Sequence, residues 1–251
     1  MITIDRIKAF FSKNNDRPSG FTDKQGRMLT VAELKMQASE SRKKWLSGFG
    51  FKMCWYMVKE GELKARGWSL NDFANAIGLE EQRFLSWNEG VSYVYSSRGG
   101  SNVFITPALN GWVYVLNFAD ELDLLDGILE SYYAFGSYRV VDYVSWKQVE
   151  ERQIVRYFQY ADGRVYHNIG VQTEQEAELT FIDITGLDNE HACEAMFSQA
   201  AFNNPDITNI ADEEDVMALC KAWTGQDLLV LDTYPINSVT EQGVSGVLLD
   251  R

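Results

Sequence analysis

The chain has 251 residues, of which 45% are hydrophobic and 13% aromatic, and this composition excludes an intrinsically disordered protein. Its formal net charge of −13 argues against nucleic-acid binding, because a large negative field repels phosphate. No stretch approaches the ~18 to 20 consecutive apolar residues of a membrane span, which argues against an integral membrane protein.

The start of the chain predicts a helical N-terminal segment over residues 1–51. Apolar residues recur at helical spacing in residues 2–13, and the polar, turn-rich stretch Asn14–Gly20 ends that helix. A second helix begins at Thr30, which has the spacing of a capping box with Glu33. Because charges interrupt the first apolar run, and the 3 cysteines are widely spaced, we expect a cytoplasmic protein without disulfides.

Two successive stretches predict the same order, in which a strand and a helix are followed by consecutive strands, and we denote this order β-α-β-β. Ser69 is a suitable N-cap for the first helix, and Asp162-Gly163 is a strong hairpin signal in the second stretch. The first unit is predicted to comprise a strand at Met53–Val58, a helix at Ser69–Ile77 and strands at Phe84–Trp87, Val91–Tyr95 and Asn102–Thr106. The second is predicted to comprise a strand at Trp112–Asn117, a helix at Glu121–Tyr133 and strands at Tyr138–Trp146, Gln153–Tyr160 and Arg164–Asn168.

The pattern therefore predicts an α+β fold, in which a duplicated β-α-β-β core spans residues 52–170. The consecutive hairpins favour a mixed or mainly antiparallel sheet, and we expect the helices to pack on one of its faces. Residues 171–251 are expected to form an acidic α/β part packed on this core, so that the chain makes one compact domain. In this part we predict a strand at Thr180–Ile184, helices at Asn189–Gln199 and Ala211–Trp223, a short strand at Leu228–Leu231 and a weakly patterned tail from Asn237.

The negative charge is concentrated in the last third of the chain. Residues 171–251 contain 16 Asp and Glu but only Lys221 and Arg251 as cations, a net of −14. Residues 1–170 carry a net of +1, because 21 bases offset 20 acids. Such a field attracts basic partners, although acidity also keeps an ordinary protein in solution.

The residues that usually carry catalysis or bind metals are few. His167 follows an alternating strand beside a hairpin signal, and His191 lies two residues before Cys193. A His-x-Cys pair supplies two ligands where a structural zinc site needs four, so we expect no metal site. Glycine-rich phosphate loops and the G-x-S-x-G elbow are absent from the sequence, and we expect no cofactor and no catalytic residues.

The densest acidic cluster is Asp212, Glu213, Glu214 and Asp215. Consecutive residues on a helix point around its circumference, so these four side chains cannot all converge on one ion. One interpretation is a solvated first helical turn, where acids suit the helix dipole. The other, which we take as the candidate binding site, is a surface for a basic protein partner.

Several segments resemble a bacterial protein family. The resemblance rests on Phe135–Trp146 with Arg156–Tyr160, on Asp212–Val216 with the Ala222-Trp223 pair, and on Cys54–Lys59. These patches are similar to immunity proteins of polymorphic-toxin and contact-dependent competition systems, and they cover roughly residues 52–225. The resemblance implies an acidic cytoplasmic protein that neutralises a cognate toxin, and it implies no catalytic residues.

Our leading hypothesis is thus a non-enzymatic immunity or antitoxin-like protein that occludes a basic toxin domain. Two alternatives stay open. In the first, two of the 36 acids of the chain form an unrecognised catalytic carboxylate pair, as in a hydrolase. In the second, the chain is a structural or regulatory subunit that self-associates as a homo-oligomer.

Overall fold

The computed structural model describes residues 30–31, 44–96, 101–118, 122–179, 182–198, 203 and 211–248. The chain divides into two compact units, residues 1–44 and 45–251. The predicted helix over residues 2–13 lies outside the described residues, and so does most of the helix predicted from Thr30 to about Leu46. Val31 is helical, whereas residues 44–46, at the predicted end of this helix, are not, and Trp45 makes an isolated bridge with Pro235.

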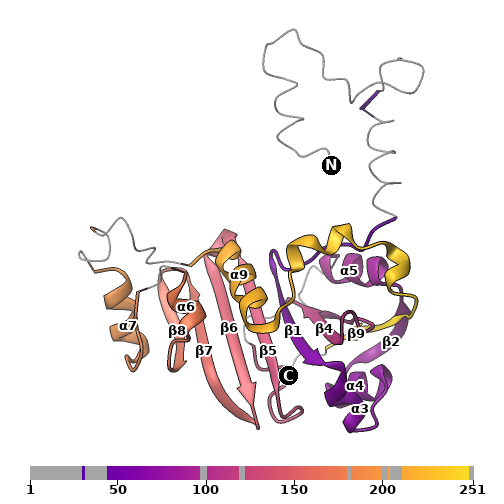
Figure 1. Cartoon of the computed structure of the whole chain (residues 1–251), viewed down its shortest axis with the longest axis horizontal. Helices are drawn as coiled ribbons and strands as arrows, with labels where there is room; N and C mark the ends of the chain where they lie inside the picture. The colour runs from indigo at the N-terminus through magenta and orange to yellow at the C-terminus, as the bar shows by residue number, and fades with distance from the viewer. Residues whose placement is uncertain are drawn as a thin grey trace. The chain divides into compact units, whose positions relative to one another are not determined.

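One antiparallel sheet of nine strands organises this unit (Figure 1). The strand order is β2-β9-β3-β4-β1-β5-β6-β7-β8, and every neighbouring pair is antiparallel. Together with its helices, the sheet confirms the predicted α+β class. The strands are β1 (Met53–Lys59), β2 (Glu80–Leu85), β3 (Asn102–Ile105), β4 (Trp112–Asn117), β5 (Tyr132–Tyr138), β6 (Tyr143–Glu150), β7 (Gln153–Ala161), β8 (Arg164–Gly170) and β9 (Gly243–Val247).

Helices cover both faces of the sheet, and the prediction of a single covered face is wrong. Central strands β1 and β4 are buried along almost their whole length, which is why both read as continuous apolar runs rather than as alternating ones. The helices are α3 (Glu60–Ala65), α4 (Leu70–Ala76), α5 (Trp87–Tyr95), α6 (Glu174–Ala177), α7 (Asn189–Met196) and α9 (Glu213–Thr224). Short 3-10 turns are η2 (Arg139–Val141), η3 (Leu228–Thr233) and η4 (Ile236–Ser238).

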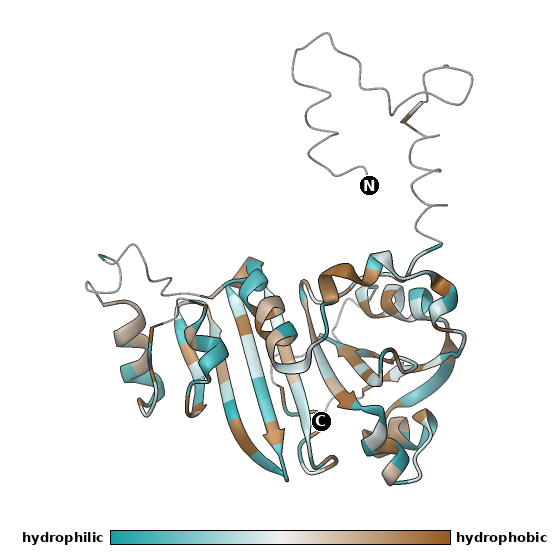
Figure 2. Ribbon diagram, in the orientation of Figure 1, coloured by the Kyte–Doolittle hydropathy of each residue, from teal (hydrophilic) through white to brown (hydrophobic). Residues whose placement is uncertain are grey.

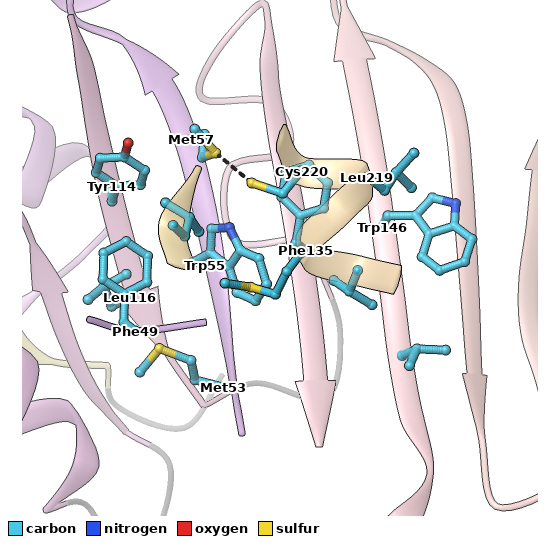
Figure 3. Close-up of a cluster of buried hydrophobic side chains, with 14 of the residues drawn as sticks. Phe49, Met53, Trp55, Met57, Tyr114, Leu116, Phe135, Trp146, Leu219 and Cys220 are labelled. Atoms are coloured by element: carbon cyan, nitrogen blue, oxygen red, sulfur yellow. Dashed lines mark hydrogen bonds between the residues drawn. The ribbon is translucent and has the colours of Figure 1, made fainter. Parts of the chain in front are cut away.

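The first core lies between the sheet and helices α5, α7 and α9. Figure 3 shows Leu219 and Cys220 of α9 above the rings of Trp55, Phe135 and Trp146 from the strands beneath. The Trp55 and Phe135 rings stack with centroids 5.5 Å apart. Burial of such large rings supplies much of the apolar area that holds α9 on the sheet.

The second core lies on the opposite face, under α3 and α4. Alternate residues of the same strands point into this core. Tyr56 and Val58 of β1 lie in it together with Phe73 of α4 and Ile77, the C-cap residue of α4. Four leucines from the segment between β4 and β5 complete this layer, namely Leu122, Leu124, Leu125 and Leu129. A sheet with two apolar faces therefore needs both layers.

The predicted strand at Val91–Tyr95 is wrong, because these residues belong to helix α5. Ser86 and Glu89 form a capping box that starts the helix, and Trp87 and Val91 are buried at helical spacing. Their burial against the first core overrides the strand preference of this valine- and tyrosine-rich stretch.

The predicted helix at Glu121–Tyr133 is not a helix in its described part. Residues 122–131 form turns and bends, in which backbone hydrogen bonds join residues three apart; the N–H of Asp126, for example, donates to the carbonyl of Asp123 at 2.9 Å. Strand β5 already begins at Tyr132. Lys147, buried in β6, donates to the carbonyl of Leu122 at 2.9 Å and to the carboxylate of Asp126 at 2.7 Å. These bonds hold the segment as a turn, and the duplication into two β-α-β-β units is not confirmed.

The acidic last third contributes elements to the sheet and to the first core. The helices predicted at Asn189–Gln199 and Ala211–Trp223 are confirmed as α7 and α9, with slightly different ends. The strand predicted at Leu228–Leu231 is wrong, because these residues belong to the 3-10 turn η3. Of the strand predicted at Thr180–Ile184, the described residues 182–184 do not form a strand. The tail contains β9, which lies between β2 and β3.

Candidate functional site

The acidic cluster forms the first turn of α9, and two of its members cap that helix. Asp212 is the N-cap residue, and its carboxylate accepts hydrogen bonds from the backbone N–H of Glu214 at 2.8 Å and of Asp215 at 3.1 Å. Asp215 returns the bond by accepting from the Asp212 N–H at 2.9 Å. These two carboxylates therefore satisfy free amides of the helix start and reinforce its dipole.

The other two acids differ in their surroundings. Glu213 pairs with Nη1 of Arg139 at 3.5 Å, and its side chain is 17% exposed. Its Oε2 is buried and has no hydrogen-bond partner among the described residues. Glu214 is exposed, so it is the member of the cluster that faces solvent without a capping role. The four side chains do not converge, as the helical geometry predicts.

Asp215 of this turn has a shifted pKa, and burial is the largest cause. Burial raises the pKa of its carboxyl, and the charges of Asp212 and Glu214 raise the pKa further, while the hydrogen bond from the Asp212 N–H opposes the shift. The first turn of α9 thus holds its negative charge against mutual repulsion, which a cationic partner would relieve.

The Arg139–Glu213 pair joins this turn to the connection between β5 and β6. We call Tyr138, Val140 and Val141 the β5–β6 corner; their exposed fractions are 42%, 69% and 38%. The corner was missed because Tyr138–Trp146 was predicted as one strand. In the structure β5 ends at Tyr138, η2 follows, and β6 begins at Tyr143. Asp142, with a φ of 48°, makes the left-handed turn between them, and an aspartate tolerates this conformation better than most residues.

Exposed acids extend from α9 over its neighbours α6 and α7. Helix α6 contacts α9, and α7 contacts β8, so the three helices follow the same half of the sheet (Figure 1). In Figure 2 the ribbon of α6 is coloured mainly as hydrophilic. We call this surface the acidic layer; its exposed members are Glu174, Glu178, Asp183, Asp188, Glu190, Glu194, Asp212 and Glu214. Lys221 is the one cation in the described part of residues 171–251, and it pairs with Asp227 at 2.8 Å.

A buried ion pair fixes α6 beneath this layer. Arg156 of β7 and Glu176 of α6 are both fully buried, and Nε of the arginine lies 2.9 Å and 3.1 Å from the two carboxylate oxygens. The indole N–H of Trp146 and the backbone N–H of Thr173 also donate to this carboxylate. Glu176 is thus committed to holding α6 in place. The spacing of Thr173 and Glu176 is a capping-box signal that the sequence contains.

The side chains of His167, His191 and Cys193 each contact a different partner. The His167 ring stacks on Tyr157 with centroids 4.2 Å apart. His191 Nδ1 lies 2.8 Å from the carboxylate of Asp188, and this hydrogen bond and charge raise the pKa of the imidazole. The thiol of Cys193 instead donates to the carbonyl of Gly163 at 3.3 Å. Among the described residues, no group of three or more His, Cys, Asp or Glu side chains is placed to hold a metal ion.

Comparisons of this chain with protein-family models, with curated proteins and with solved structures find no match. Of the helices in the described ranges, none has both the length and the apolar character needed to cross a membrane.

Proposed function

We propose that this protein is a non-enzymatic binding protein of the immunity or antitoxin type, which occludes a basic toxin domain with its acidic layer. The acidic layer is the observation that carries the proposal. It combines exposed carboxylates from α6, α7 and α9 with one cation in the described part of residues 171–251, Lys221, which Asp227 already neutralises. Arg139, from the connection between β5 and β6, lies beside the layer and pairs with Glu213.

The layer suits binding because its scaffold is fixed before any partner arrives. Helix α9 is held by its apolar face in the first core, and α6 is held by the buried Arg156–Glu176 pair. A preformed surface loses less conformational entropy on association than a flexible one. Carboxylates that do not have to move also steer a cationic partner during diffusion, which raises the association rate at low ionic strength.

The charge of the layer also defines the class of partner. Nucleic acids and anionic lipid surfaces carry the same sign and are repelled, whereas a basic protein is attracted. Toxins that act on nucleic acids need basic surfaces to hold phosphate, so an acidic protein that covers such a surface blocks the substrate as well. A negatively charged surface also suits the immunity role that the resemblance of Phe135–Trp146 and Asp212–Val216 implies.

The test uses the full chain and the product of the gene that adjoins its own. We expect co-expression to restore growth that the adjoining product alone arrests, and the two purified proteins to form a salt-sensitive complex. One charge variant replaces four acids of the layer by Gln, at Glu178, Glu190, Glu194 and Glu214. Its matched control replaces four exposed acids elsewhere, at Glu80, Glu81, Glu151 and Glu241.

Each exposed ion pair contributes about 0.2 to 1 kcal/mol, so the layer variant should bind about tenfold more weakly at low salt, and the control variant less than about twofold. If the adjoining product is neither bound nor neutralised, the immunity role is wrong. If the complex forms and both variants bind like the parent chain, the acidic layer is not the interface.

A further inference from the structure

The β5–β6 corner places apolar side chains where a tight connection normally carries polar ones. Val140 is 69% exposed, and Tyr138 and Val141 flank it at 42% and 38%. Gly, Asn, Asp and Ser dominate such connections because their side chains or backbone suit turns and water. Valines at this position leave apolar area in solvent that the described part of the chain does not cover.

The corner is held in one conformation by contacts on both sides. Arg139, between Tyr138 and Val140, pairs with Glu213 of α9 at 3.5 Å. The backbone N–H of Asp162, in the β7–β8 hairpin, donates to the carbonyl of Val141 at 3.1 Å. The exposed side chains are therefore presented by a fixed backbone, which suits a binding contact because little order remains to be gained on association.

Three exposed acids and one exposed cation, Arg139, adjoin these apolar side chains, which leaves a net negative charge beside them. Asp142 follows Val141 directly, Asp162 is bonded to the same backbone, and both are exposed. Glu214 is exposed one residue after the partner of Arg139. An apolar centre with a charged rim is the arrangement in which a buried hydrophobic anchor gives affinity and the rim gives specificity.

The charge of the rim selects the occupant. A second copy of this chain, docked corner to corner about a twofold axis, would bring a rim of three acids, Asp142, Asp162 and Glu214, and one cation, Arg139, against an identical rim, so repulsion would outweigh attraction. Anionic lipid and nucleic acid meet the same repulsion. A protein segment with an apolar side chain between Lys or Arg residues instead meets matching chemistry at both the centre and the rim.

We propose that the β5–β6 corner is the apolar anchor point for a basic protein partner, and that it engages a segment in which cationic side chains flank a bulky apolar residue. This proposal rests on the proposed function, because the β5–β6 corner adjoins the acidic layer at the start of α9. It adds a contact that gives affinity even when salt has screened the charges.

The test uses the full chain and two synthetic peptides of equal charge. One peptide alternates Arg with Leu, and in the other each Leu is replaced by Ser. We expect the Leu peptide to bind about tenfold more tightly in fluorescence anisotropy, as burial of a few apolar side chains should give. Val140→Ser with Val141→Ser should remove this difference, while Phe84→Ser, an exposed apolar residue on the distant strand β2 (58% exposed), should leave it intact.

A second pair of measurements separates folding from binding. Thermal unfolding should be unchanged in the double Ser variant, and Val140→Thr with Val141→Thr, which keeps side-chain shape, should lose part of the preference for Leu. If the two peptides bind equally and the four-acid layer variant weakens both, the corner proposal is overturned while the proposed function stands. If neither peptide binds the chain, or if the corner variants change only a concentration-dependent mass of the chain alone, the corner proposal is overturned as well.

Discussion

Replacing Glu176 by Gln should destabilise the protein more than any surface charge change. The substitution removes the carboxylate that lies 2.9 Å and 3.1 Å from Nε of Arg156, at a site where both side chains are fully buried. The guanidinium cannot lose its proton, so its charge is left without a counter-ion in the core. Removal of one partner of a buried ion pair costs about 3 to 5 kcal/mol.

The neighbouring donors make the upper part of that range the better expectation. Trp146 and Thr173 both donate to the same carboxylate, and a Gln side chain offers one acceptor oxygen for three donors. A buried donor left without an acceptor costs about 1 to 3 kcal/mol. We therefore expect Glu176→Gln to lower the free energy of unfolding by about 4 to 5 kcal/mol, measured by urea unfolding of the full chain with tryptophan fluorescence.

Two further variants make this reasoning testable. Adding Arg156→Met to Glu176→Gln removes the stranded charge, so the double variant should regain at least about 1 kcal/mol over the single one. Lys64→Gln, which breaks the exposed pair with Glu60, should cost less than about 0.5 kcal/mol. A loss below about 1 kcal/mol for Glu176→Gln, or a double variant less stable than the single one, would show that the pair does not hold α6 in place.

Three other outcomes follow from single sites. Asp188 raises the pKa of His191, so the protonated pair stabilises the start of α7 at pH values below the unfolded pKa of the imidazole. This stabilisation is lost as the pH rises through the folded pKa. An NMR titration of His191 should show a lower pKa in Asp188→Asn, and an unchanged pKa would refute the pairing. Gly170→Ala should lower the free energy of unfolding in urea by at least about 2 kcal/mol, because φ is +82° and the new Cβ would lie 1.9 Å from a backbone oxygen of β7. Gly127→Ala is the control: φ is +74° and the Cβ would meet open space, so the loss should be about 1 kcal/mol. Burial raises the pKa of the Cys220 thiol to about 12, so it should stay unmodified by a thiol reagent at neutral pH until urea unfolds the chain; rapid labelling of the folded protein would contradict its placement.

Local signals predicted the parts of the fold that local interactions decide. The start of α9 was foreseen because Asp212 and the acids after it suit a helix N-terminus, and the hairpin at Asp162-Gly163 forms as its sequence indicates. The capping box of Ser86 and Glu89 was also present in the sequence. We read the residues after it as strand because Val91–Tyr95 has strand-forming side chains, and only packing on the first core decides for a helix.

Long-range contacts decided what the pattern alone did not indicate. Strand β9 has two glycines in five residues, which weakens any strand signal. Both are needed for close packing: a Cβ at Gly243 would lie 2.3 Å from the carbonyl oxygen of Ile105, and one at Gly246 would lie 2.6 Å from that of Glu80. The candidate site divides in the same way between local and long-range contacts. The sequence predicts the capped first turn of α9, whereas the link through Arg139 to the β5–β6 corner depends on a contact between residues far apart in the chain.

The position of β9 has a consequence for the order in which the protein is built. On the ribosome, Glu80–Leu85 and Asn102–Ile105 emerge long before Gly243–Val247, the strand that hydrogen-bonds to both. Until then β2 has no strand to join, and the neighbouring edge of β3 is open to other chains, which is the situation in which nascent sheets misassemble. Folding of this half of the molecule therefore waits for nearly the whole described chain, and loss of the last described strand would detach β2 from the sheet.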